Sequence, residues 1–232
     1  MTMKQEYGEN GIKDFLKESL DSYLSSRQFS FKPERSLMDV ETGQYIWYEK
    51  GSMIMYDLQD VMGEDRVNTG LKSFLDEFKY FEKGRYASSE DLYNALYAVT
   101  PDSLKYKVDD GFKEIVLYEN RVMDAKTTAL DNGKWETTFT LNSKKIYYDD
   151  TGKEKLVDEK ENLVDVGLFG EDETNEDGIT VKNPFYFELM WLSSGDNTFT
   201  IITDKKPLKA GIDPYNKLID RNSDDNLKSV ED

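Results

Sequence analysis

The stretch that decides the fold reads YIWYEKGSMIMYDLQDVM and occupies residues 45–62. It is the only segment with helical spacing that is apolar on more than one face. The larger face follows the 3/4 spacing of a helix, and a smaller second face lies beside it: Trp47, Gly51, Ile54, Leu58 and Val61 on the first, and Tyr48, Ser52, Met55 and Met62 on the second. Because a helix that is apolar on several faces is buried, we expect the rest of the chain to pack around this one.

Two glycines bear on this segment, one inside the expected helix and one directly after it. Gly51 lies inside it, next to the charged pair Glu49 and Lys50 that interrupts the apolar pattern. A glycine inside a helix costs about 1 kcal/mol relative to alanine, so we expect another part of the chain to pass too close for a side chain. Gly63 is expected to end the helix.

The same residues carry a family resemblance. The sequence YEKGS at 48–52, followed by an apolar helix, Gly63-Glu64 and a second amphipathic helix, resembles the aminopeptidase N family of zinc metallopeptidases downstream of its zinc site. In that family a Tyr-x-Lys-Gly segment opens a buried helix, and its tyrosine donates a hydrogen bond to the oxyanion of the tetrahedral intermediate. The resemblance implies this catalytic role for Tyr48. It extends, more weakly, into a β-rich segment.

A second resemblance concerns the end of the chain. Residues 209–221, KAGIDPYNKLIDR, are similar to the tail of a bacterial subgroup whose peptidase-like region is fused behind an ABC-transporter-type permease. This implies that the chain is membrane-associated through a fused or partner permease.

Composition limits the possible functions. The 232 residues allow one large domain or two small ones, and 47 acidic against 30 basic residues give a net charge of −17. Such a field repels phosphate backbones and anionic lipids, so we expect no nucleic-acid partner. No apolar run approaches the roughly 20 residues of a membrane span, and residues 1–6 do not open a signal peptide. With no cysteine there is no disulfide or thiolate site.

The chain also has no histidine. This removes the commonest zinc ligand and the commonest general base at neutral pH. The family's His-Glu-x-x-His motif is therefore absent, and we expect no metal ligands and no cofactor in this chain. By resemblance, the complete enzyme binds zinc.

The first 113 residues show helical periodicity. Residues 4–26 and 64–81 carry apolar stripes, Ser88 and Asp91 have the spacing of a capping box, and Thr100-Pro101 is expected to begin a further helix with Thr100 as N-cap. Residues 28–43 form a connector.

From residue 114 the period changes to 2. Strands are expected over 115–122, 125–130, 135–142, 163–170, 185–192 and 198–203, with a hairpin turn at Asp131-Asn132-Gly133. Phe185, Phe187, Leu189 and Trp191 are expected to share one face. The sequence thus predicts an α+β protein: a helical segment resembling the end of a thermolysin-like catalytic domain (1–113), an antiparallel β-sandwich (114–220) and a flexible tail (221–232).

Each candidate site has a structural alternative. A tyrosine on a buried helix is ordinarily a packing residue whose hydroxyl is tied to a neighbour, and only the resemblance makes Tyr48 catalytic. The acidic run 171–178 matches a calcium loop when Glu173 is position 1, but Pro184 then stands where a bidentate glutamate is required, so we interpret the run as a solvated connection. The pairs Asp149-Asp150 and Asp224-Asp225 are interpreted as turn and tail charges.

Two functional hypotheses remain. The first is the C-terminal part of an aminopeptidase N-like zinc metallopeptidase, inactive alone, with a missing N-terminal peptidase half or permease region as partner and a peptide as substrate of the complete enzyme. The second is a non-catalytic module that binds a protein or scaffolds a membrane transporter. The first makes the chain part of an enzyme, and the second does not.

Overall fold

The computed structural model describes residues 2–81, 83–155, 157, 161–174, 176, 178 and 180–232, with the backbone alone for residues 2–10 and 180. These residues form two compact units. The helical unit comprises residues 19–116 and 147–156, and the sheet unit comprises residues 1–18, 117–146 and 157–232. Neither unit is one continuous segment, which differs from the expected division at residue 114.

Helices occupy the first part of the chain, as its periodicity predicts. Their bounds are α1 (Thr2–Gln28), the π-helix η1 (Ile46–Lys50), α2 (Gly51–Met62), α3 (Glu64–Phe78), the 3₁₀ turn η2 (Lys79–Phe81), α4 (Ser89–Val99), the 3₁₀ turn η3 (Asp102–Leu104) and α5 (Lys105–Phe112). The capping box is confirmed, because the Ser88 hydroxyl accepts from the Asp91 N–H while the Asp91 carboxylate accepts from the Ser88 N–H. Gly63 ends α2 with φ +89°, a conformation that favours glycine.

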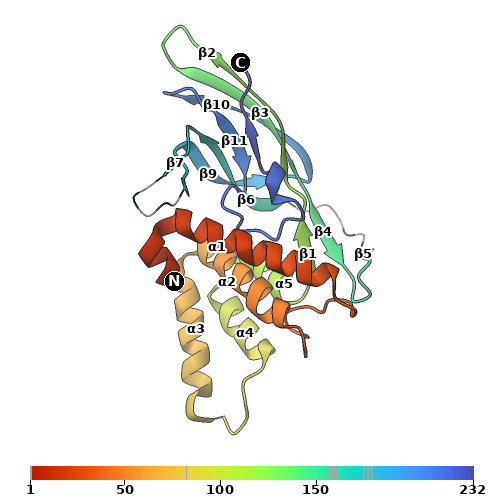
Figure 1. The fold of residues 1–232 in the computed structure, drawn as a ribbon. Coiled ribbons are helices and arrows are strands. Elements are labelled where there is room, and N and C mark those ends of the chain that lie inside the picture. The colour runs from red at the N-terminus through yellow and green to blue at the C-terminus, as the bar shows by residue number, and fades with distance from the viewer. Residues whose placement is uncertain are drawn as a thin grey trace. The chain divides into compact units, whose positions relative to one another are not determined.

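The helices α3 and α4 lie side by side (Figure 1). A Cβ atom added at Gly70 of α3 would lie 3.0 Å from the Ala95 carbonyl oxygen of α4. The glycine therefore lets the two backbones approach closely.

Thr100 is not an N-cap, and that prediction is wrong. Its hydroxyl donates to the Leu96 carbonyl at 2.7 Å, one turn back in α4, and η3 begins after Pro101 without a side-chain cap. A threonine at a helix end can bond backward or forward, and spacing alone does not separate the two.

Strands follow from residue 115. Their bounds are β1 (Ile115–Tyr118), β2 (Arg121–Ala129), β3 (Trp135–Ser143), β4 (Lys145–Tyr148), β5 (Glu154–Lys155), β6 (Asn162–Phe169), β7 (Glu173–Thr174), β8 (Thr180–Val181), β9 (Pro184–Leu192), β10 (Gly195–Thr203), β11 (Lys209–Ile212) and β12 (Leu227–Ser229). They form sheets in the orders β1-β4-β5, β10-β3-β2, β12-β11-β6-β9 and β7-β8. The α+β class is confirmed, and a sandwich of the sheets stays a prediction.

The hairpin between β2 and β3 has the expected turn. The Leu130 N–H donates to the Lys134 carbonyl, and Gly133 has φ +81°. Along β3 the inward residues Thr137, Phe139 and Leu141 are fully buried, which confirms the alternation of a half-buried strand. The apolar face expected on β9 is less buried, since Leu189 and Trp191 are 39% and 46% exposed.

The segment 209–221 is a buried corner of the sheet unit. Asp213, at φ +43°, accepts hydrogen bonds from the N–H groups of Lys217 and Leu218 and so closes the turn that follows β11. The Lys217 ammonium lies 2.7 Å from the Asp165 carboxylate on β6. Asp213 and Lys217 of this segment therefore have structural roles, since one closes a turn and the other forms an ion pair.

Residues 221–232 contain regular structure, which differs from the flexible tail expected there. Strand β12 pairs with β11, and the Glu231 N–H donates to the Ala125 carbonyl at 2.9 Å. Polar composition predicted fraying, but backbone hydrogen bonds do not depend on side-chain polarity.

Asp220 should make the stability of the protein depend on pH. Burial raises its pKa to about 6, against the usual value of about 3.9 in an unfolded chain. The folded state then binds more protons than the unfolded state between about pH 4 and 6, so this contribution is fully present below that window and is lost as pH rises through it. Relative to Asp220→Asn, we expect the wild type to lose on the order of 1–3 kcal/mol of unfolding free energy from pH 4 to pH 7.

Urea unfolding of both proteins across that range measures the difference. A difference that is independent of pH would show that Asp220 has an ordinary pKa in the folded protein.

Candidate functional site around Tyr48

The helical unit contains an open cavity of about 450 Å³ beside the start of α2, and we call it the Tyr48 pocket. Its walls come from the connector before η1 and from η1, α2, α4 and α5. The lining residues are Leu37, Trp47, Tyr48, Gly51, Ser52, Met55, Ser89, Leu92 and Phe112. The size is that of a small-ligand site, and the lining is mainly apolar.

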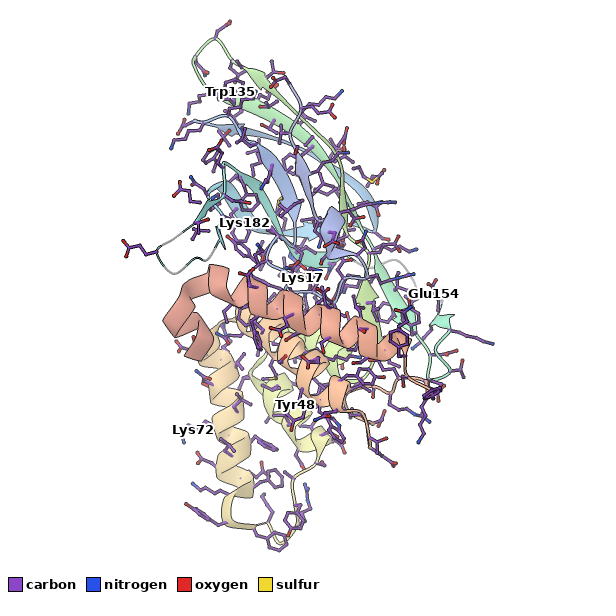
Figure 2. The ribbon with its side chains drawn as sticks, in the orientation of Figure 1. Lys17, Tyr48, Lys72, Trp135, Glu154 and Lys182 are labelled. Atoms are coloured by element: carbon purple, nitrogen blue, oxygen red, sulfur yellow. The ribbon has the colours of Figure 1, made fainter. Side chains whose placement is uncertain are left out.

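Tyr48, labelled in Figure 2, lies in η1 directly before α2, and it is not buried. Its side chain is 65% exposed and that of Trp47 is 47% exposed. The expectation that both residues lie on buried faces is therefore wrong. Within the part of the chain that the structure describes, the Tyr48 hydroxyl has no hydrogen-bond partner. The packing alternative for Tyr48 thus lacks the contact that it requires.

The two serines of the pocket differ from Tyr48 in this respect. The Ser52 hydroxyl donates to the Glu49 carbonyl at 2.9 Å, and the Ser89 hydroxyl donates to the Met38 carbonyl at 2.6 Å. Both serine hydroxyls donate to backbone oxygens, whereas the Tyr48 phenol has no acceptor in the described part of the chain.

A π-helical turn sets the direction of Tyr48. In η1 the residues Ile46 and Lys50 are buried, at 2% and 1% exposure, while Trp47 and Tyr48 lie on the outer side. Isolated π turns within helices are rare and occur frequently at functional sites. The turn is therefore the local feature that separates the inward anchor Lys50 from the outward Tyr48.

Lys50 is held by a buried carboxylate from the connector. Its Nζ lies 2.6 Å from Glu34 Oε1, and Glu34 Oε2 accepts from the Tyr23 hydroxyl and the Arg27 Nε, each at 2.7 Å. The Arg27 guanidinium also lies over the Tyr148 ring at 4.4 Å. Three donors thus converge on one carboxylate.

The ionisation of this cluster follows from its geometry. Burial opposes the charge of Glu34, but Lys50, Tyr23 and Arg27 outweigh it, so the pKa of Glu34 is lowered. Burial lowers the pKa of Lys50, and the ion pair with Glu34 opposes this shift. Burial also raises the pKa of Tyr23 well above its usual value, so its phenol stays a proton donor. The three donors around Glu34 therefore favour the charged form of its carboxylate.

Gly51 does not mark a close approach, which corrects another expectation. A Cβ atom there would lie 3.5 Å from the Ile46 carbonyl oxygen, an ordinary contact. The close approach occurs at Gly111 of α5, where a Cβ atom would lie 2.7 Å from the Ile54 side chain of α2. Gly51 instead lines the pocket, where the absence of a side chain leaves space.

The pocket does not fit a zinc ion. Its lining has no histidine, cysteine, aspartate or glutamate, the groups that bind zinc in proteins. Across the described ranges no group of three or more such residues could hold a metal.

The acidic segments have structural roles where they are described. The Asp149 carboxylate accepts from the N–H groups of Thr151 and Lys153 and closes the turn after β4. Asp224 lies 3.5 Å from Lys17 within the sheet unit. Glu173, position 1 of the calcium loop considered above, is the first residue of β7. Residues 175 and 177 of the same run lie outside the described residues.

Comparison with known proteins supports a peptidase relation for the helical part. The sequence model of the peptidase family M1 domain matches residues 5–112. The match supports a relation of this part of the chain to M1 family peptidases, and so to metallopeptidases. It covers the helices from residue 5 of α1 to the end of α5 and includes every residue that lines the Tyr48 pocket. No curated protein matches the chain. Among the described helices, none is long and apolar enough to cross a membrane.

Sequence reasoning identified Tyr48 but missed the rest of its site. Glu34 follows Pro33 in a connector without periodicity, and no spacing relates it to Lys50. Leu37, Ser89 and Phe112 come from segments far apart in the chain. A charged residue such as Lys50 inside an apolar helix was the one available signal, because a buried lysine requires a partner.

Proposed function

We propose that this chain supplies the transition-state tyrosine and the β-rich region of an aminopeptidase N-like metallopeptidase. The zinc ligands and the general base would come from polypeptide that is not part of this sequence. In this proposal the chain alone is inactive. The likeness of residues 209–221 to permease-fused relatives supports a further, finer part of the proposal, namely that the peptidase works beside a membrane transporter.

One observation carries the proposal: the side chain of Tyr48 lines the pocket, is 65% exposed, and has no hydrogen-bond partner among the described residues. It lies on a π turn whose inner side is anchored by Lys50 and Glu34. A packing tyrosine would direct its hydroxyl to a neighbour, whereas this one is available to a ligand.

The chemistry of a phenol suits the proposed role. It is a neutral donor, so it gains most when the acceptor becomes negative, as the carbonyl oxygen of a peptide does in the tetrahedral intermediate. The missing half of the enzyme would have to cover this open site, and excluding water there would strengthen the hydrogen bond. The role of this chain is therefore to hold a donor in place before the reaction.

A complementation experiment tests the proposal. The chain is mixed, or expressed as a fusion, with a zinc-binding peptidase segment that carries His-Glu-x-x-His, and hydrolysis of an aminoacyl fluorogenic substrate is measured. We expect no hydrolysis and no stoichiometric zinc for the chain alone, and zinc-dependent hydrolysis for the combination. Hydrolysis by the chain alone, or by the zinc segment equally well without it, would contradict the proposal.

Exposed aromatic side chains favour a second candidate, a protein-binding module. Phe29, Phe31, Tyr80 and Tyr86 of the helical unit are 75%, 105%, 90% and 86% exposed. Large exposed apolar groups mark contact surfaces when they are contiguous, and the exposed rings of Phe81 and Tyr86 lie 5.2 Å apart between centroids. If the combination shows no hydrolysis but the two polypeptides associate in sedimentation, this candidate is supported instead.

A further inference from the structure

The carboxylate of Glu34 connects three parts of the helical unit. Glu34 itself lies in the connector. Its carboxylate accepts hydrogen bonds from the Tyr23 hydroxyl and the Arg27 Nε of α1, and it forms an ion pair with Lys50 at the end of η1. Side-chain exposure is 3% for Glu34 and 1% for Lys50, so the pair is shielded from water. Tyr48 lies two residues before Lys50 on the opposite side of the same turn.

We propose that the Glu34–Lys50 ion pair is a positioning device that holds the π turn in the register that places Tyr48 in the lining of the pocket. Lys50 and Glu34 are positioning residues, because they act through Tyr48. The inference rests on the proposed function, since the position of Tyr48 matters for activity only if its hydroxyl meets the substrate.

The geometry of the turn explains why an anchor is needed. A π turn contains one residue more than an α turn, and an α-helix advances about 100° per residue. If η1 relaxed to α-helical register, the residues before Lys50 would rotate by about this angle relative to α2. Tyr48 would then leave the lining of the pocket, although α2 itself would stay in place because Met53, Ile54 and Leu58 are buried.

An ion pair fixes this register better than an apolar side chain would. An apolar residue at position 50 could pack in several orientations, whereas Nζ has to meet one oxygen of a carboxylate whose other oxygen is bound by Tyr23 and Arg27. Buried polar groups fix register in this way in other helical proteins. Burying two charges is unfavourable, and in this proposal the fold accepts that penalty because the pair fixes the position of Tyr48.

The test uses the full chain with 3-fluorotyrosine incorporated at position 48 and observed by ¹⁹F NMR. The variant is Lys50→Met/Glu34→Gln, which removes both charges of the buried pair and leaves the partly exposed Arg27 with an amide oxygen in place of the carboxylate. The matched control is Lys107→Met/Asp57→Asn, because Lys107 is equally buried and lies 3.1 Å from both carboxylate oxygens of Asp57 on α2. Circular dichroism verifies that each variant is folded.

We expect the Tyr48 resonance to shift or split by more than its line width in the Glu34–Lys50 variant and to stay in place in the control. A resonance unchanged in both would overturn the positioning role, and so would an equal shift in both, because that would report general loosening. Glu34→Gln alone, which keeps the side-chain volume, replaces the double variant if the latter does not fold.

The same variants in the complemented enzyme separate the inference from the proposed function. We expect the Glu34–Lys50 variant to lower kcat by at least tenfold with a much smaller change in KM, the pattern of an interaction made in the transition state. A shifted resonance with unchanged kcat would leave the positioning role intact and remove Tyr48 from catalysis. An unshifted resonance would overturn the positioning role whatever the activity.

Discussion

Replacing Lys50 with methionine is expected to lower the free energy of unfolding by about 3 kcal/mol, toward the lower end of the 3–5 kcal/mol measured when one partner of a buried ion pair is removed. The physical reason is the carboxylate left behind. Glu34 would keep its bonds to Tyr23 and Arg27 but lose the closest cation, at 2.6 Å, in a site that water does not reach. Arg27 compensates part of the charge, which is why we expect the lower end of the range. Urea unfolding at pH 7 measures the change.

Lys72→Met on α3 is the matched control for this prediction. Lys72 forms an ion pair with Asp76 but is 77% exposed, so its loss should change the unfolding free energy by no more than about 0.5 kcal/mol. Removing the charge of Glu34 as well, in Lys50→Met/Glu34→Gln, should restore part of the lost stability. A Lys50→Met protein as stable as the control would mean that the buried pair is not formed in solution.

Tyr48→Phe is expected to lower kcat of the complemented peptidase by on the order of 10²–10³, the range for the loss of one oxyanion donor. KM should change far less, because the hydrogen bond strengthens only as negative charge develops. The substitution should leave the unfolding free energy within about 0.5 kcal/mol of wild type, since the exposed hydroxyl has no partner among the described residues. Steady-state kinetics and urea unfolding of the same variant measure both quantities.

The control for this prediction is Tyr86→Phe. Tyr86 is also exposed, at 86%, and lies outside the pocket. It should change neither kcat nor stability appreciably. If Tyr48→Phe lost stability and kept its kcat, Tyr48 would be a packing residue and the catalytic assignment would be wrong.

Only one residue of the candidate site, Tyr48, could be predicted from the sequence. Tyr48 stands out because YEKGS precedes an apolar helix, which is a local pattern. Its exposure was predicted wrongly, because a helical wheel drawn with 3.6 residues per turn takes no account of the π turn in η1. The extra residue moves Trp47 and Tyr48 outward and Lys50 inward.

The sequence by itself determined the order and type of the elements. Periods of 3.6 and 2 identify the helices before residue 113 and the strands after it, because burying one face requires apolar residues at the spacing of that face. Capping at Ser88, the stop at Gly63 and the turn at Gly133 were readable for the same reason, since each depends on the conformation of a few adjacent residues.

Only the tertiary structure decided which distant residues meet. Glu34 reaches Lys50, and Phe112 reaches the pocket beside Tyr48, through packing that no local spacing encodes. The same holds for two other contacts. Position 111 requires a glycine because the Ile54 side chain of another helix lies against it, and β12 pairs with β11 although its segment is polar. A contact between segments depends on how all the intervening elements pack, and that free energy belongs to the whole fold rather than to either segment.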